Sequence, residues 1–85
     1  MYLTGTLQNQ IIKDNHSDFS LRGMVNPTFQ NDGESYVVIN GIKVLPGKTY
    51  SVYAPVVLQN SIPITFESDK TKTRALRLGF LKVTS

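Results

Sequence analysis

Few residues in this chain could carry out chemistry, and they are far apart in the sequence. Among its 85 residues there is one histidine, His16, and no cysteine. Asp14 and Asp18 flank His16, but a serine hydrolase also needs a serine on a strained turn, and no serine here has such a setting. Zinc requires three or four nitrogen or sulfur ligands. We therefore interpret His16 as a solvated loop residue and expect neither a hydrolytic triad nor a zinc site.

The six acidic residues offer two further candidate sites. Asp32 and Glu34, with Asn31 beside them, could reach one calcium ion, but their spacing differs from that of a calcium-binding loop, and an Asp-Gly pair is explained by turn geometry. Glu67 and Asp69 are too close in the chain to flank a glycosidic bond as an acid and base. The sequence thus predicts a protein that is not an enzyme and binds no metal or cofactor.

The composition predicts one small domain spanning residues 1–85. Apolar residues make up 40% of the chain, which is enough for a single core. A domain of this size buries only about 60–65% of its unfolded surface and is marginally stable alone. Because there is no cysteine, no disulfide can add stability, and oligomerisation remains as the source of it. The N-terminal residues show no signal peptide or membrane span, so we expect synthesis in the cytoplasm.

The net charge of +3 is unevenly distributed along the chain. After Asp69 there are five basic residues and no acidic one: Lys70, Lys72, Arg74, Arg77 and Lys82. Such a run is usually a solvated loop and strand surface. It could also contact phosphate or an acidic protein. Both interpretations stay open.

The central part of the chain predicts three short strands, at residues 36–39, 42–45 and 49–53. Asn40-Gly41 joins the first two strands, and this pair accepts the positive φ angles of a type I′ hairpin turn. Pro46-Gly47 follows the second strand and suits a type II turn. We therefore predict an antiparallel meander with both dipeptides at hairpin tips.

Further strands are predicted at residues 2–7, 19–25, 62–66 and 74–83, where apolar and polar residues alternate. Residues 8–18 are predicted to form a loop, Asn26-Pro27 to end the second strand, and residues 31–33 to form a turn in which Asp-Gly can adopt the same type I′ geometry. Pro63 lacks an N–H and is expected at a sheet edge or where that N–H would face solvent. No segment has helical spacing. The fold prediction is all-β, a small antiparallel sandwich of jelly-roll kind or a small barrel, with six to eight strands.

The last strand has apolar residues on both faces. Leu76, Leu78 and Phe80 share one face, whereas Leu81 and Val83 lie on the other. Either a bulge near Gly79 changes the register, or both faces are covered, one of them by a second chain. The strand at residues 36–39 raises the same question. The predicted contact residues on these two strands are Tyr36, Val38, Leu76, Leu78, Leu81 and Val83.

A resemblance to a known family lies in the central segment. Asn31-Asp32-Gly33, Val38-Ile39-Asn40-Gly41 and Leu45-Pro46-Gly47-Lys48-Thr49-Tyr50 resemble a pattern of small β-sandwich structural proteins of tailed bacteriophage particles, in which Asn-Gly, Leu-Pro-Gly and a strand starting with Thr or Ser and an aromatic residue follow one another. The resemblance covers about a quarter of the chain. It implies assembly contacts and no active site.

Two functions from different classes follow. The first is a non-enzymatic component of a phage particle, for head decoration, the head–tail junction or the tail, made in the host cytoplasm and acting through self-association and contacts with other virion proteins. The alternative is a small β module that binds carbohydrate or single-stranded nucleic acid, which would need exposed aromatic residues on a concave patch. Its candidates are Tyr2, Tyr36, Tyr50 and Tyr53. Neither function involves a membrane.

Overall fold

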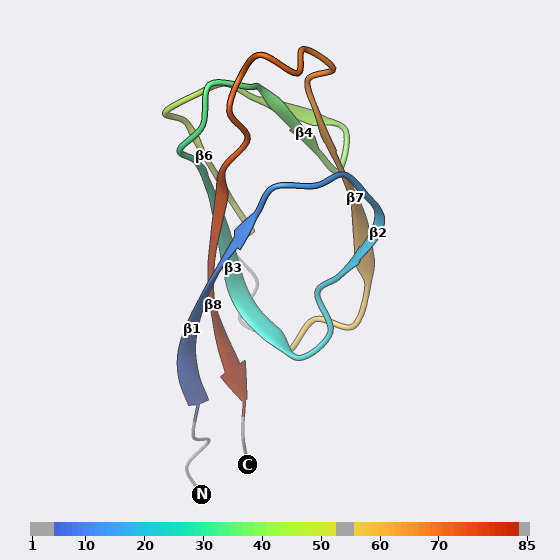
Figure 1. Ribbon diagram of the computed structural model, residues 1–85. Helices are drawn as coiled ribbons and strands as arrows, with labels where there is room; N and C mark the ends of the chain where they lie inside the picture. The colour runs from blue at the N-terminus through green and yellow to red at the C-terminus, as the bar shows by residue number, and fades with distance from the viewer. Residues whose placement is uncertain (1–4, 53–55, 84–85) are drawn as a thin grey trace, which may run out of the picture.

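The computed structural model describes residues 5–52 and 56–83 of the chain, with Val83 described in its backbone only. These residues form eight strands and no helix (Figure 1). In chain order the strands are β1 (Gly5–Ile12), β2 (His16–Ser20), β3 (Met24–Asn31), β4 (Val37–Ile39), β5 (Ile42–Val44), β6 (Thr49–Ser51), β7 (Ser61–Phe66) and β8 (Leu76–Val83). Within these ranges no helix is long and apolar enough to cross a membrane.

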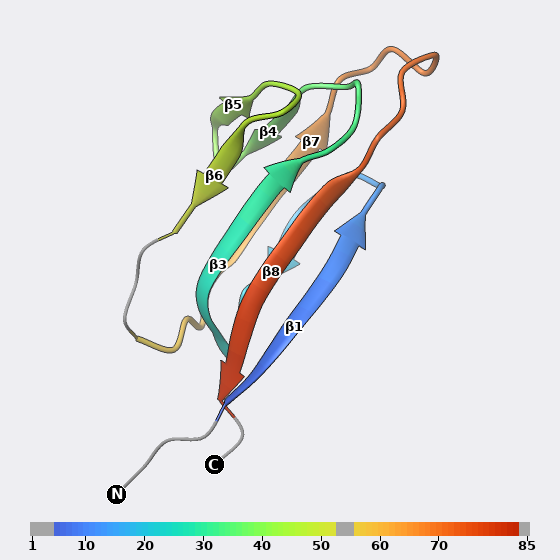
Figure 2. The ribbon, with the colours of Figure 1, turned by 90° about the vertical axis from the view of Figure 1, so that its left-hand side faces the viewer.

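The strands form two four-stranded sheets that pack face to face. Sheet A has the order β1-β8-β3-β6 and sheet B the order β2-β7-β4-β5, and every neighbouring pair is antiparallel. Figure 2 looks onto sheet A, with sheet B behind it. The predicted all-β fold is confirmed, in its sandwich form.

The core fills the space between the sheets because apolar residues alternate along the inner face of each strand. β7 shows this most clearly, since Ile62, Ile64 and Phe66 are buried and the residues between them are exposed. Phe29 of β3 and Leu78 of β8 face them from sheet A with no exposed surface. The buried apolar residues from both sheets and the connections form one cluster.

Both predicted central turns are present, but only one is a hairpin tip. Asn40 and Gly41 have φ angles of 50° and 83° and connect β4 to its partner β5, as a type I′ turn requires. At the second turn Gly47 has a φ of 82° and the Lys48 N–H donates to the Leu45 carbonyl over 3.0 Å. However, this turn connects β5 of sheet B to β6 of sheet A. The predicted three-stranded meander is therefore wrong.

The first third of the chain differs from the prediction in three places. The expected loop at residues 8–18 is largely strand, because β1 pairs with β8 through Ile12, and β2 begins at His16. The expected strand at residues 19–25 is interrupted by a turn in which Gly23 has a φ of 86°. Asn26 and Pro27 do not end a strand, but lie inside β3 at a register shift opposite β8. A bulge tolerates the missing N–H of proline.

Pro63 lies in a central strand, so of the two positions expected for it the sheet edge is excluded. β7 has β2 on one side and β4 on the other. The β2–β7 register shifts between His16 and Phe19, which pair with Ile64 and Ile62. Two β2 residues therefore face Pro63, and this bulge interrupts the ladder at the residue that has no N–H to donate. On the other side the Pro63 carbonyl accepts a hydrogen bond from the Asn40 N–H over 3.0 Å.

Asn31, at the end of β3, connects the two sheets through its buried side chain. Its Nδ2 donates to the carbonyls of Ser35 over 2.8 Å and Val44 over 3.0 Å, and its Oδ1 accepts from the Gly33 N–H over 3.1 Å. Its backbone also bonds the turn between β5 and β6. The Asn31 carbonyl accepts a hydrogen bond from the Gly47 N–H, and the Asn31 N–H donates one to the Lys48 carbonyl. One fully buried amide thereby joins sheet A to the ends of β4 and β5.

Gly33 makes this junction tight. A Cβ at this position would be 2.7 Å from both the Ala75 nitrogen and the Thr73 oxygen, so any side chain would clash with backbone. Its φ is not positive, so the chain bends here without the type I′ geometry that an Asp-Gly pair can adopt. Glycine is required here for the close approach of two chain segments.

Replacing Gly41 by Val should lower the free energy of unfolding by about 1 kcal/mol or more, because a β-branched residue disfavours positive φ. Nothing lies within 4 Å of the Cβ that would be added, so the loss reports the backbone alone. Asn40→Gly is the control, since glycine accepts the φ of 50° without strain. Denaturant unfolding measures both, and an unchanged midpoint for Gly41→Val would contradict the turn.

Asn31→Ala should lower the free energy of unfolding by about 3 kcal/mol, because it leaves two buried carbonyls and one N–H without their partner. Gln30→Ala, one residue earlier on the half-buried outer side, should change it by less than about 0.5 kcal/mol. Chemical denaturation of both variants provides the comparison. Equal losses would show that Asn31 does not connect the sheets energetically.

Candidate functional surface

The outer face of sheet A carries exposed apolar residues because the strand β8 has no bulge. Its register with β1 is unbroken from Leu76 to Val83. The register shift that the sequence suggested near Gly79 lies instead in the neighbouring strand β3. Leu81 therefore points away from the core and is 42% exposed.

Leu81 belongs to an apolar row that crosses three strands. It pairs with Leu7 of β1 on one side and with Val25 of β3 on the other. Leu7 is 70% exposed, and Ile11, on the same face of β1, is 52% exposed. No described segment of the chain crosses this face, which points toward the viewer in Figure 2. The start of β1 and the end of β8 extend beyond the β2–β3 connection in Figure 1.

Two shallow hollows in this face meet at Gly79. The larger, of about 420 Å³, is mostly apolar and is lined by Leu7, Asn26, Thr28, Gly79, Phe80 and Leu81. The smaller, of about 190 Å³, is polar and is lined by Asn9, Thr28, Gln30, Arg77 and Gly79. A Cβ at Gly79 would lie 3.2 Å from Asn9 Oδ1, so the missing side chain leaves the hollow between them. The face is thus apolar near Leu7 and Leu81, and toward its other end polar side chains lie beside the exposed Ile11.

The structure separates the predicted contact residues into surface and core. Leu76 and Leu78 have no exposed surface, because they point between the sheets, and the prediction that they contact a partner needs this correction. Leu81 is exposed on sheet A. Tyr36 and Val38 are half-buried at β4 of the other sheet. For Val83 only the backbone pairing with Gly5 is described.

The tyrosines named for a ligand-binding patch are not brought together. Tyr50 packs against the core, with its ring centroid 6.2 Å from that of Phe29. Tyr36 lies on the other sheet, with Lys43 Nζ 4.3 Å above its ring. Tyr2 and Tyr53 lie outside the described residues. The pair that is described therefore makes no common stacking surface.

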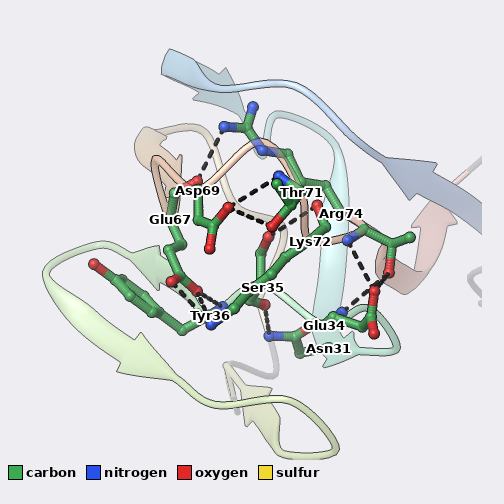
Figure 3. A network of polar contacts seen from close by, with 10 residues as sticks. Asn31, Glu34, Ser35, Tyr36, Glu67, Asp69, Thr71, Lys72 and Arg74 are labelled. Atoms are coloured by element: carbon green, nitrogen blue, oxygen red, sulfur yellow. Dashed lines mark hydrogen bonds and ion pairs between the residues drawn. The ribbon is translucent and has the colours of Figure 1, made fainter.

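Much of the basic C-terminal segment is engaged within the chain. Lys72 forms an ion pair with Glu67 over 3.1 Å, and Arg77 forms one with Asp32 over 3.3 Å. Arg74 Nη2 donates to the Glu67 carbonyl over 3.0 Å. Figure 3 shows how Glu67, Lys72 and Arg74 gather where the β7–β8 connection meets the residues that follow β3. These contacts favour the solvated, structural interpretation of the basic run.

Two groups in this network titrate away from their ordinary values. Hydrogen bonds from the Thr71 hydroxyl and N–H lower the pKa of Asp69, and the hydrogen bond to Glu67 raises the pKa of Lys72. The Asp69 contact thus stabilises the fold above the ordinary carboxylate pKa and is lost as pH falls. The Lys72 contact is present below the ordinary lysine pKa and is lost as pH rises. Lys72 is exposed and Asp69 is only half-buried, so these contributions are small.

One concentration of positive charge remains next to this network. A hollow of about 370 Å³ is lined by four cationic side chains: Lys13, Lys70, Lys72 and Arg74. Lys13 comes from the β1–β2 connection and was not part of the predicted basic segment. Only the pairing of strands far apart in sequence brings it there, and no local signal could have identified it.

The carboxylates considered for calcium have protein partners. Asp32 binds Arg77, and the Glu34 carboxylate accepts hydrogen bonds from the Thr73 N–H and hydroxyl over 3.3 and 3.2 Å. Asn31 uses its side chain to connect the sheets. In the part of the chain that the structure describes, no three His, Asp or Glu residues gather as metal ligands would. His16 is exposed and lies edge-on to Phe19, with ring centroids 5.3 Å apart.

Comparisons with protein-family models, with curated proteins and with solved structures found no match. The chemistry and geometry of the surface therefore carry the functional argument.

Proposed function

We propose that this protein is a non-enzymatic structural subunit that assembles through the outer face of sheet A. The observation that carries the proposal is the outward position of Leu81 beside Leu7 on a face that no described segment covers. Contiguous exposed apolar residues on a small domain mark a contact surface.

The two outer faces of the sandwich differ in the side chains that they expose, and this difference favours sheet A as the contact surface. On sheet B the exposed residues of the central strand β7 are Ser61, Pro63 and Thr65, and Lys43 lies across β4 from Thr65. On sheet A the corresponding central strand presents Leu81, with Leu7 next to it. Burying an exposed leucine side chain contributes about 1.5–3 kcal/mol when the burial is complete. Covering the outer face of sheet A with a partner therefore contributes more stability than covering that of sheet B.

The assembly that we propose is a tailed-phage particle. This part of the proposal is supported by the resemblance of residues 31–50 to small β-sandwich proteins of such particles. In that setting the subunit contacts copies of itself and other virion proteins, and it is made in the host cytoplasm before assembly. A marginally stable 85-residue domain benefits from such contacts, since association stabilises the folded state by mass action.

A second candidate function is the binding of a single-stranded nucleic acid. The observation in its favour is the hollow lined by Lys13, Lys70, Lys72 and Arg74, because converging cations attract a phosphate backbone. Against it stand the ion pair of Lys72 with Glu67 and the packing of half-buried Tyr50 against Phe29 of the core, which removes a stacking surface. We therefore rank it second.

Leu81→Glu should abolish association through the outer face of sheet A and leave the chain folded, because the side chain is exposed and outside the core. Thr65→Glu is the matched control: it places the same charge on an exposed central-strand position of sheet B. Sedimentation velocity reports association and circular dichroism reports folding. If Leu81→Glu associates like the control, or if the unmodified protein stays monomeric with its virion partners present, the proposal fails.

For the second candidate, a labelled dT₂₀ oligonucleotide should bind in low salt and weaken as salt rises. The double variant Lys13→Ala/Lys70→Ala should reduce the salt dependence, since each lost phosphate contact with a single strand lowers the slope by about 0.7. Lys43→Ala, on the outer side of sheet B, is the control. Fluorescence anisotropy measures all three, and equal binding by both variants would exclude this site.

A further inference from the structure

Of the four edge strands of the sandwich, β1 alone lacks the features that prevent pairing with another strand. The edges of the sheets are β1 and β6 in sheet A and β2 and β5 in sheet B. β5 and β6 have three residues each, and β2 is interrupted by a bulge. Short length and bulges protect an edge. β1 has eight residues in continuous register with β8, and it contains no charged residue and no proline.

Residues 7–11 of β1 are chemically symmetric about Asn9. On either side of Asn9 stands a glutamine, Gln8 and Gln10, and beyond these stands an apolar residue, Leu7 and Ile11. All five side chains are exposed. Two antiparallel copies of one strand pair each position with its mirror position about the two-fold axis.

We propose that β1 pairs with β1 of a second copy of this chain, antiparallel and centred on Asn9. The pairing places Leu7 opposite Ile11 of the second copy and Gln8 opposite Gln10 of the second copy, each twice. Apolar residues thus face apolar residues on the outer side, and amides face amides on the inner side. Cross-strand pairs of this kind stabilise a sheet, and the backbone ladder supplies hydrogen bonds. Sheet A becomes one eight-stranded sheet across two subunits.

This inference rests on the proposed function and specifies its first contact. The outer-face row of one copy, Leu7 and Leu81, continues into Ile11 of the second copy. The two-fold axis therefore joins the apolar surfaces of two subunits into one larger patch. A further virion protein would then contact a surface formed by two subunits.

The first experiment uses the absence of cysteine from the natural chain. In Asn9→Cys two thiols would face each other on the axis, with Cα atoms about 4.5–5.5 Å apart, which suits a disulfide. Thr6→Cys is the matched control on the same strand. Its position faces Ile12 of the second copy, so its two thiols would be about 20 Å apart. Under mild oxidation Asn9→Cys should give covalent dimer on non-reducing gels and Thr6→Cys should not.

The second experiment tests register and direction with charges at positions 8 and 10. Q8K/Q10K and Q8E/Q10E place like charges opposite each other, whereas Q8K/Q10E and Q8E/Q10K place opposite charges together. The opposite-charge variants should dimerise at least about tenfold more tightly than the like-charge ones. Both side chains are exposed, and circular dichroism confirms that every variant folds. Sedimentation equilibrium measures the dissociation constants.

The outcomes separate this pairing from the proposed function. Equal dissociation constants for all four charge variants, or no Asn9→Cys dimer from a protein that self-associates, would overturn the pairing and leave assembly through the outer face standing. A double variant Asn9→Cys/Leu81→Glu that still forms covalent dimer supports the edge contact independently of that face. If the charge variants differ in their dissociation constants while Leu81→Glu associates as strongly as the unmodified protein, the outer-face assembly is overturned instead.

Discussion

The sandwich depends on the buried side chain of Asn31. The ends of β4 and β5 and the tip of β3 belong to different sheets, and the carbonyls of Ser35 and Val44 are bonded by one amide that comes from the opposite sheet. Hydrophobic packing between two sheets is non-directional and would tolerate sliding. Hydrogen bonds of fixed geometry define how far one sheet is displaced relative to the other, and Gly33 allows the β7–β8 connection to approach this point.

What the sequence could predict was mostly local. The alternation at Ile62, Ile64 and Phe66 and the positive φ angles at Asn40 and Gly41 depend on neighbouring residues, and both were predicted correctly. Which sheet the chain joins after Pro46-Gly47 depends on strands far away in the sequence, because after the same turn the chain can pair within its own sheet or cross to the other. The role of Asn31 was not predicted, since an Asn before Asp-Gly has the appearance of an ordinary turn residue.

The surface shows the same division between local and distant information. That β8 has apolar residues on both faces was visible in the sequence, but whether Leu81 points outward depended on which strand carries the bulge. The bulge lies in β3, at Asn26-Pro27, where proline removes a donor from the ladder. A sequence feature that had been interpreted as the end of one strand thus determines the surface of another. The basic hollow likewise needs Lys13, which tertiary pairing alone brings to Lys70 and Arg74.

The pairing of β1 with β8 has a consequence for synthesis. These are the first and the last of the described strands, and Gly5 pairs with Val83 across almost the whole chain. Such long-range contacts close slowly. While the ribosome makes the intervening residues, β1 lacks its neighbour β8, whereas the β4–β5 hairpin can already form. On a polysome, adjacent nascent chains therefore present unpaired, uncharged β1 segments to each other. If β8 is completed quickly, it pairs with β1 of its own chain. If it is completed slowly, β1 has time to pair with a strand of a neighbouring chain.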